Sequence, residues 1–136
     1  MSYQLDFSIR RRINTSDIGI TIPAMLARNQ RTVLCDAKVD TGSEYCFFQN
    51  EIAVALGLNV ESGIPITLGT LAGTISAYAH TIQLHTLGIV YESTVLFSAH
   101  PGLPRNILGR VGWLENLHLA LTMDDEMIYL KPAYSE

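Results

Sequence analysis

The chain has 136 residues, which suits a single domain, and 48% of them are apolar while only 16% carry a charge. This composition excludes an intrinsically disordered protein, because disorder needs low hydrophobicity and high charge. The net charge of −4 argues against nucleic acid or an anionic membrane as a partner, and Ile, Val and Thr supply 31 residues, which favours β structure.

Three features bear on the cellular compartment. No apolar run approaches the roughly 18 residues of a membrane span, and segment 1–14 lacks the apolar core of a signal peptide. The two cysteines, Cys35 and Cys46, form no C-x-x-C motif and are too few for a disulfide framework. We therefore expect a cytoplasmic protein with reduced thiols.

Alternation of apolar and polar residues predicts strands in the first part of the chain. Residues 1–17 form either a strand or an extension that lies on a partner. Strands are expected over residues 18–26 and 31–39. Both strands place apolar residues at every second position, which is typical of strands with one buried face.

Two short helices are expected. The first spans residues 50–57, with Asn50 as its N-terminal cap and Gly57 just beyond its C-terminus. The second spans residues 110–117, after a loop rich in Pro and Gly. Neither is long enough to form a helical layer of its own.

The remaining strands form hairpins. Residues 64–84 predict a long hairpin with its tip near Ala72 and Gly73, and a strand over residues 89–98 follows it. A last hairpin spans residues 117–131. The sequence therefore predicts one all-β domain with two short helices over residues 1–136.

The segment Asp40-Thr41-Gly42-Ser43 is the main chemical signal in the sequence. These are turn-forming residues, so the segment could simply end a strand. However, Asp40 directly follows Val39 on a strand that is expected to be buried, and a carboxylate that enters a core needs compensating partners. This position favours a functional role for Asp40.

A second segment, Asn106-Ile107-Leu108-Gly109-Arg110, follows further along the chain, with Ile107 67 positions after Asp40. Together the two segments resemble the retropepsin-like aspartic proteases over roughly residues 18–130. In that family a D-[ST]-G-[AS] loop carries the catalytic aspartate, and an apolar–apolar–Gly segment threads past it. The elements between the two segments also match: a short helix, a flap-like hairpin and then a strand.

The resemblance implies a closed, β-barrel-like retropepsin fold with one D-T-G loop per chain. Two copies would then form a homodimer in which a pair of Asp40 carboxylates activates a water molecule and hydrolyses a peptide bond of a peptide or protein substrate. The implied function is that of an aspartic endopeptidase. The alternatives are a catalytically silent module that dimerises or binds peptides, and a small β-barrel scaffold in which D-T-G is only a turn.

The resemblance also implies roles for the neighbours of Asp40. Thr41 would hold the two loops together across the dimer axis, Gly42 would let the substrate backbone approach, and Ser43 would form a hydrogen bond near the aspartate pair. The expected substrate-binding residues are Lys38, Tyr45, Leu71, Ala72, Gly73, Arg105 and Ile107. No metal or other cofactor is expected, since His80 and His85 are five apart and would face opposite sides of one strand.

Three expectations follow from departures and matches within the family. Retroviral members carry apolar residues at the positions of Lys38 and Arg105, so two basic side chains predict a preference for acidic or polar substrate groups, unless both extend into solvent. Retroviral members also pair the residues that match Glu44 and Arg110, which predicts an ion pair here. Retroviral subunits associate through terminal strands, whereas this chain ends with a helix and a hairpin, which is closer to a eukaryotic pattern of the family. We therefore expect the hairpin over residues 117–131 to contribute strands to the dimer interface.

Overall fold

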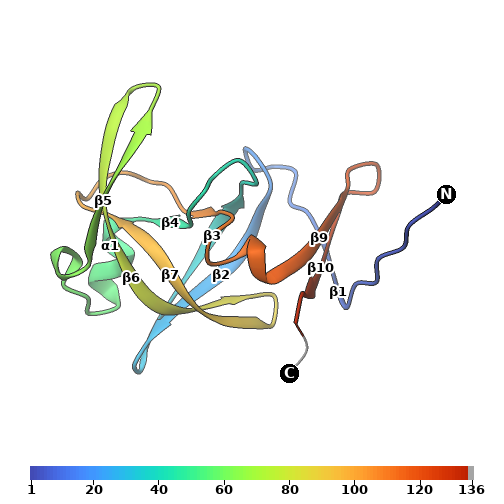
Figure 1. The fold of residues 1–136 in the computed structure, drawn as a ribbon, viewed down its shortest axis with the longest axis horizontal. Helices are drawn as coiled ribbons and strands as arrows, with labels where there is room; N and C mark the ends of the chain where they lie inside the picture. The colour runs from blue at the N-terminus through green and yellow to red at the C-terminus, as the bar shows by residue number, and fades with distance from the viewer. Residues whose placement is uncertain (135–136) are drawn as a thin grey trace.

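The computed structural model describes residues 1–134 and consists mainly of β-strands with one short α-helix (Figure 1). The strands are β1 (Ile9–Arg12), β2 (Thr21–Arg28), β3 (Arg31–Val39), β4 (Phe47–Phe48), β5 (Ile64–Thr70), β6 (Gly73–Thr86), β7 (Ile89–Ser98), β8 (Ile107–Leu108), β9 (Leu117–Thr122) and β10 (Met127–Pro132). The helical elements are α1 (Asn50–Ala55) and two 3-10 turns, Val60–Ser62 and Leu114–Asn116. Within the described residues no helix is long and apolar enough to cross a membrane.

The larger sheet closes on itself. Its strand order is β2-β3-β8-β4-β7-β6-β5, and β2 also pairs with β6, so that the strands from β2 to β6 form a ring. Leu26 of β2, for example, lies opposite Val33 of β3 and Leu84 of β6. The predicted barrel-like, all-β fold is therefore confirmed.

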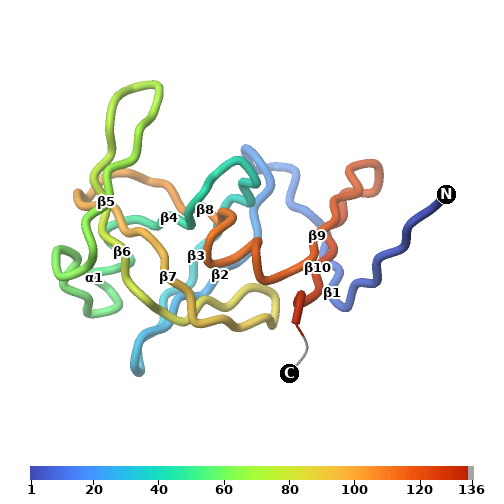
Figure 2. Tube along the Cα trace, viewed as in Figure 1, coloured from blue at the N-terminus to red at the C-terminus, as the bar shows by residue number. Residues whose placement is uncertain are grey.

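The smaller sheet has the order β1-β10-β9 and is formed by the two ends of the chain. Ile9 of β1 lies opposite Leu130 of β10, which in turn lies opposite Leu119 of β9. Figure 2 shows this sheet at one end of the molecule, with α1 and the β5–β6 hairpin at the other. Residues 9–12 of the N-terminal segment thus form a strand.

A single large hydrophobic cluster fills the interior of the ring and reaches the smaller sheet. Trp113, Phe48 and Phe97 are among its largest fully buried side chains. Trp113 also satisfies its indole N–H, which donates to the Thr86 hydroxyl over 2.9 Å. A second, smaller cluster around Phe47 and Leu96 lies beneath the β5–β6 hairpin.

The strands over residues 31–39 and 89–98 have the predicted bounds. The predicted strand over residues 18–26 begins three residues later, at Thr21, because Gly19 has a φ of +83° that strand geometry does not allow. The long hairpin is also present, with Leu71 and Ala72 in its turn. Its second strand extends to Thr86, slightly further than the sequence pattern indicated.

The second predicted helix, over residues 110–117, is wrong. Val111 instead forms a β-bridge with Tyr45, and only Leu114–Asn116 forms a 3-10 turn. Gly112 has a φ of +93°, which an α-helix does not allow, and a Cβ atom there would lie 3.0 Å from the Thr94 carbonyl oxygen. Long-range pairing therefore overrides the local pattern.

The first helix has the predicted position but a different N-terminus. Asn50 is its first helical residue and Gln49 takes the cap position, with no side-chain cap hydrogen bond. The Asn50 amide instead donates to the carbonyl oxygens of Ser98 and Ala99, which ties the helix to the end of β7. Gly57 follows the helix with a φ of +76°, as predicted for the residue beyond a C-terminal cap.

Candidate active site

Asp40 lies directly after β3, at the start of a loop that we call the Asp40 loop (residues 40–45). Its backbone N–H donates to the Leu108 carbonyl oxygen over 3.0 Å, which extends the parallel pairing of β3 with β8 by one residue. Its carboxylate accepts a hydrogen bond from the Gly42 N–H over 3.0 Å, and its carbonyl oxygen accepts one from the Ser43 N–H. These contacts compensate the half-buried carboxylate and hold the loop in a tight turn.

The segment from Leu108 to Val111 threads past the Asp40 loop. The Arg110 and Val111 N–H groups donate to the carbonyl oxygens of Ser43 and Glu44 over 2.9 and 2.8 Å. At Gly109, the residue before Arg110, a Cβ atom would lie 2.2 Å from the Tyr45 carbonyl oxygen, so only glycine fits. The two segments singled out in the sequence are therefore joined by backbone hydrogen bonds.

Cys46 stabilises the same crossing through contacts with the Leu108–Val111 segment. Its fully buried sulfur accepts a hydrogen bond from the Gly109 N–H over 3.3 Å and lies 3.4 Å from the Val111 carbonyl oxygen. Burial raises the pKa of the Cys46 thiol to about 11, and the Glu115 carboxylate also acts in this direction. The side chain therefore stays a neutral thiol at neutral pH and supports the loop structurally.

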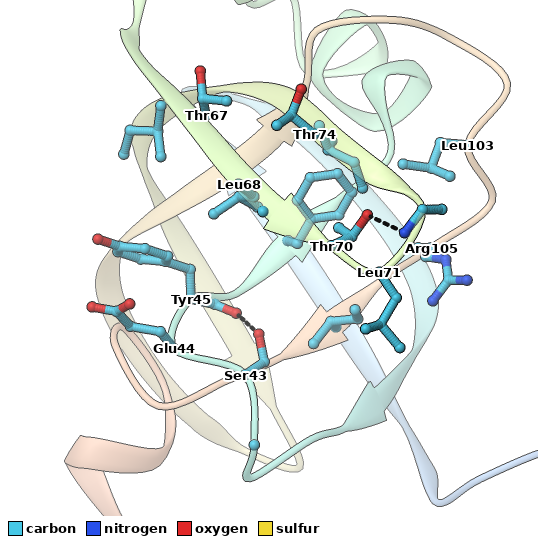
Figure 3. Close-up of a pocket in the computed structure, with 17 residues that line it drawn as sticks. Ser43, Glu44, Tyr45, Thr67, Leu68, Thr70, Leu71, Thr74, Leu103 and Arg105 are labelled. Atoms are coloured by element: carbon cyan, nitrogen blue, oxygen red, sulfur yellow. Dashed lines mark hydrogen bonds between the residues drawn. The ribbon is translucent and has the colours of Figure 1, made fainter.

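A cavity of about 990 Å³ opens beside the Asp40 loop. It is bounded by residues 42–47, by the β5–β6 hairpin and by the loop that leads into β8, and Figure 3 shows the side chains that line it. Most of these side chains are apolar, and they include Phe47, Ile66, Leu68 and Ile75. A space of this volume with largely apolar walls, beside the loop that carries Asp40, suits a peptide.

Most of the predicted substrate-binding residues lie around this cavity. Tyr45, Leu71, Ala72, Arg105 and Ile107 line it, as do Gly42, Ser43 and Glu44. Gly73 lies at the hairpin tip with a φ of +126° but is not a lining residue. Asp40 and Thr41 adjoin the cavity along the chain without lining it in this single copy.

Lys38 does not reach the cavity. Its side chain lies along the backbone of Gly19, where a Cβ atom would be 2.9 Å from the Lys38 Cε. Only the backbone of Lys38 contacts the loop that borders the cavity, because its N–H donates to the Asn106 carbonyl oxygen. Of the two basic residues expected beside substrate, only Arg105 is thus placed in the cavity wall.

The expected ion pair between Glu44 and Arg110 is absent from the described part of the chain. Both side chains are exposed. Only their backbones take part in the crossing. The Arg110 N–H donates to the Ser43 carbonyl oxygen, and the Glu44 carbonyl oxygen accepts a hydrogen bond from the Val111 N–H. Backbone pairing, and not the charges, therefore joins the two segments within one chain.

Asn106 is a site residue that the sequence did not reveal. Its amide oxygen accepts a hydrogen bond from the Gln49 N–H over 3.1 Å, and its amide nitrogen donates to the Gln49 side-chain oxygen over 3.0 Å. These two bonds hold the loop with Arg105 against the end of β4. In the sequence, only its position in the Asn106–Arg110 segment pointed to the site, and this position did not indicate what Asn106 does.

The fold and this loop crossing define an aspartic protease of the retropepsin-like class. The chain belongs to the aspartyl protease family, whose model matches residues 22–110, from β2 to the end of the crossing. The comparison with curated proteins gave no match.

Two solved structures share the fold. A retropepsin-like aspartic protease from Rickettsia conorii has a TM-score of 0.67 at 20% identity, over 89% of this chain and 96% of that chain. The EIAV protease complexed with the inhibitor HBY-793 has a TM-score of 0.54 at 15% identity, over 71% of this chain and 86% of that chain. At this identity the similarity establishes the fold.

Proposed function

We propose that the chain is an aspartic endopeptidase whose active site is completed by a second copy. The observation that carries this proposal is the position of Asp40, on a loop that is fixed by the Leu108–Val111 crossing and that adjoins a peptide-sized cavity. The sequence contains one D-T-G segment and hence half of an aspartate pair. A homodimer supplies the other half.

The proposed mechanism needs no group other than the two aspartates and water. Two carboxylates in contact cannot both be ionised, so the pair shares one proton. The ionised Asp40 takes a proton from a water molecule, and this water attacks the scissile carbonyl carbon. The protonated Asp40 of the other copy donates its proton to the carbonyl oxygen. The proton taken from water then passes to the amide nitrogen, the C–N bond breaks, and the amine and the carboxylic acid leave.

The Asp40 loop and the hairpin have separate roles in this proposal. Exposed Thr41 and Gly42 are available to the second copy and to the substrate backbone. The β5–β6 hairpin, whose residues 66–72 line the cavity, closes over the substrate and reduces its contact with water. Closure strengthens the electrostatic interactions at the aspartate pair because it lowers the local dielectric constant.

The test is a peptide-library cleavage assay on the wild type and on Asp40→Asn. Asparagine keeps the shape of the side chain but cannot act as a base, so we expect cleavage to disappear while the melting temperature stays unchanged or rises. Asp36→Asn is the matched control, because Asp36 is an exposed aspartate on β3, the strand that leads to Asp40. Undiminished cleavage by pure Asp40→Asn protein would exclude catalysis by Asp40.

A further inference from the structure

The cavity has charge at only two points. Of the residues that line it, only Glu44 and Arg105 carry a charge. Figure 3 shows them at opposite ends, with Glu44 beside Tyr45 and Arg105 beside Leu71 at the tip of the hairpin. Each copy in the proposed homodimer therefore presents one positive and one negative side chain to a bound peptide.

The Arg105 guanidinium has no bonded partner in the described part of the chain. Its backbone N–H donates to the Leu103 carbonyl oxygen, but its side chain forms no hydrogen bond or ion pair within residues 1–134. The side-chain carboxylate of Glu44 is equally free there. Neither charge is needed to hold the fold, so both are available to a ligand.

The position of Arg105 is nonetheless well defined. Asn106, the next residue, is held to Gln49 by two hydrogen bonds, and Ile107 begins β8. Leu71 and Leu103, which line the same cavity, are apolar. Leu71 and Arg105 are exposed in the single chain, so a substrate side chain that covers them displaces water, which strengthens an ion pair with the guanidinium.

We propose that Arg105 is a specificity-determining residue that selects peptides with an acidic side chain next to the hairpin tip. The planar guanidinium matches a carboxylate in a two-point contact, which makes it more selective than a lysine ammonium. At the other end of the cavity, Glu44 selects a basic or neutral side chain. This inference rests on the proposed endopeptidase function and adds the charge pattern of its substrate.

The experiment starts from an apolar peptide that the wild type cleaves. Each position on both sides of the scissile bond is replaced in turn by Glu, Gln or Lys, and kcat/KM is measured. We expect Glu to exceed Gln by about tenfold at a position that contacts Arg105, the size of one charged hydrogen-bonded contact. Arg105→Gln removes this preference, and Arg105→Glu changes it to a preference for Lys.

Two further variants locate the effect. Glu44→Lys leaves the Arg105-dependent preference in place and introduces a preference for Glu at a different peptide position. Arg31→Gln is the control, because Arg31 lies at the turn between β2 and β3 and is not among the residues that line the cavity. Equal cleavage of Glu and Gln peptides by the wild type, or a preference that persists in Arg105→Gln, would overturn the inference.

A binding measurement separates this inference from the proposed function. Fluorescein-labelled Glu and Gln versions of the peptide are titrated against Asp40→Asn protein, with and without Arg105→Gln. Tighter binding of the Glu peptide that depends on Arg105 supports the inference, even if the wild type cleaves nothing and the proposed function fails. Cleavage without any charge preference overturns the inference alone.

Discussion

Gly109 shows how one residue controls the geometry of the candidate active site. The Asp40 loop and the Leu108–Val111 segment approach so closely that a Cβ atom on Gly109 would lie 2.2 Å from the Tyr45 carbonyl oxygen and 2.8 Å from that of Ser43. Both contacts involve backbone atoms, which cannot rotate away. The close approach allows the hydrogen bonds from Arg110 and Val111 that hold the loop.

We predict that Gly109→Ala lowers the free energy of unfolding by at least about 3 kcal/mol, because the added methyl group forces two backbone segments apart. Proteolysis should fall with it, since the Asp40 loop loses its supporting bonds. Denaturant unfolding and peptide cleavage measure the two effects. Gly69→Ala is the control for stability, because its Cβ has no neighbour within 4 Å, and a comparable loss there would contradict this explanation.

The β5–β6 hairpin forms one wall of the cavity, and in the proposed mechanism it closes over the substrate. Figure 1 shows it extending from the body of the molecule, and most residues near its tip are exposed. Thr70 organises the tip, since its hydroxyl accepts a hydrogen bond from the Ala72 N–H over 3.3 Å (Figure 3) and donates to the Gly73 carbonyl oxygen over 2.8 Å. The tip is thus shaped by local bonds and not by the core.

We predict that Thr70→Val raises KM for a cleaved peptide about fivefold, the equivalent of roughly 1 kcal/mol, because both tip bonds are lost. The free energy of unfolding should change by less than about 0.5 kcal/mol, since the site is exposed. Steady-state kinetics and denaturant unfolding test the two statements.

Thr81→Val provides a control on the same strand, β6, in the part that pairs with β7 and not with β5. Thr81 is also exposed and shares a hydrogen bond with Thr94 over 3.1 Å, but it lies outside the cavity. Its KM should match that of the wild type. An equal rise of KM in both variants would show that the tip bonds are not specifically involved.

The whole molecule carries two sheets with different roles. The ring supports the Asp40 loop, whereas the smaller sheet joins both ends of the chain and has β1 and β9 at its edges. Edge strands have unpaired backbone groups that another chain can bind. Within the proposed homodimer, we expect β9 and β10 to contribute to the interface.

We predict that Leu121→Glu raises the dissociation constant of the dimer at least about tenfold, because a charge in a subunit interface loses its water without gaining a partner. Leu121 lies on β9 and is 37% exposed, so the single chain can solvate the new carboxylate. Specific activity should then rise with protein concentration. Sedimentation velocity and cleavage assays over a dilution series measure both.

Val90→Glu is the matched control, since Val90 is 49% exposed but lies on β7 in the larger sheet. Its dissociation constant should remain that of the wild type, and melting temperatures would show whether either variant disturbs the fold. A wild-type protein that is monomeric and fully active at assay concentration would contradict the requirement for two copies.

Several features were predictable from the sequence because they depend on neighbouring residues. Alternation defined the strand over residues 31–39, the Leu87-Gly88 turn marked the start of the strand over residues 89–98, and Gly57 marked the end of α1. Asp40-Thr41-Gly42-Ser43 and Ile107-Leu108-Gly109 indicated the family from residue identity alone. Local backbone preferences and a short chemical motif can both be recognised from adjacent residues, without knowledge of the tertiary contacts.

The tertiary structure was needed wherever distant segments meet. The pattern over residues 110–117 favours a helix, but Val111 pairs with the Asp40 loop instead, because hydrogen bonds to that loop satisfy its backbone. Lys38 and Arg105 look alike in the sequence, yet one lies along Gly19 and the other lines the cavity. Contacts between segments more than sixty residues apart follow from chain packing, and no local pattern encodes them.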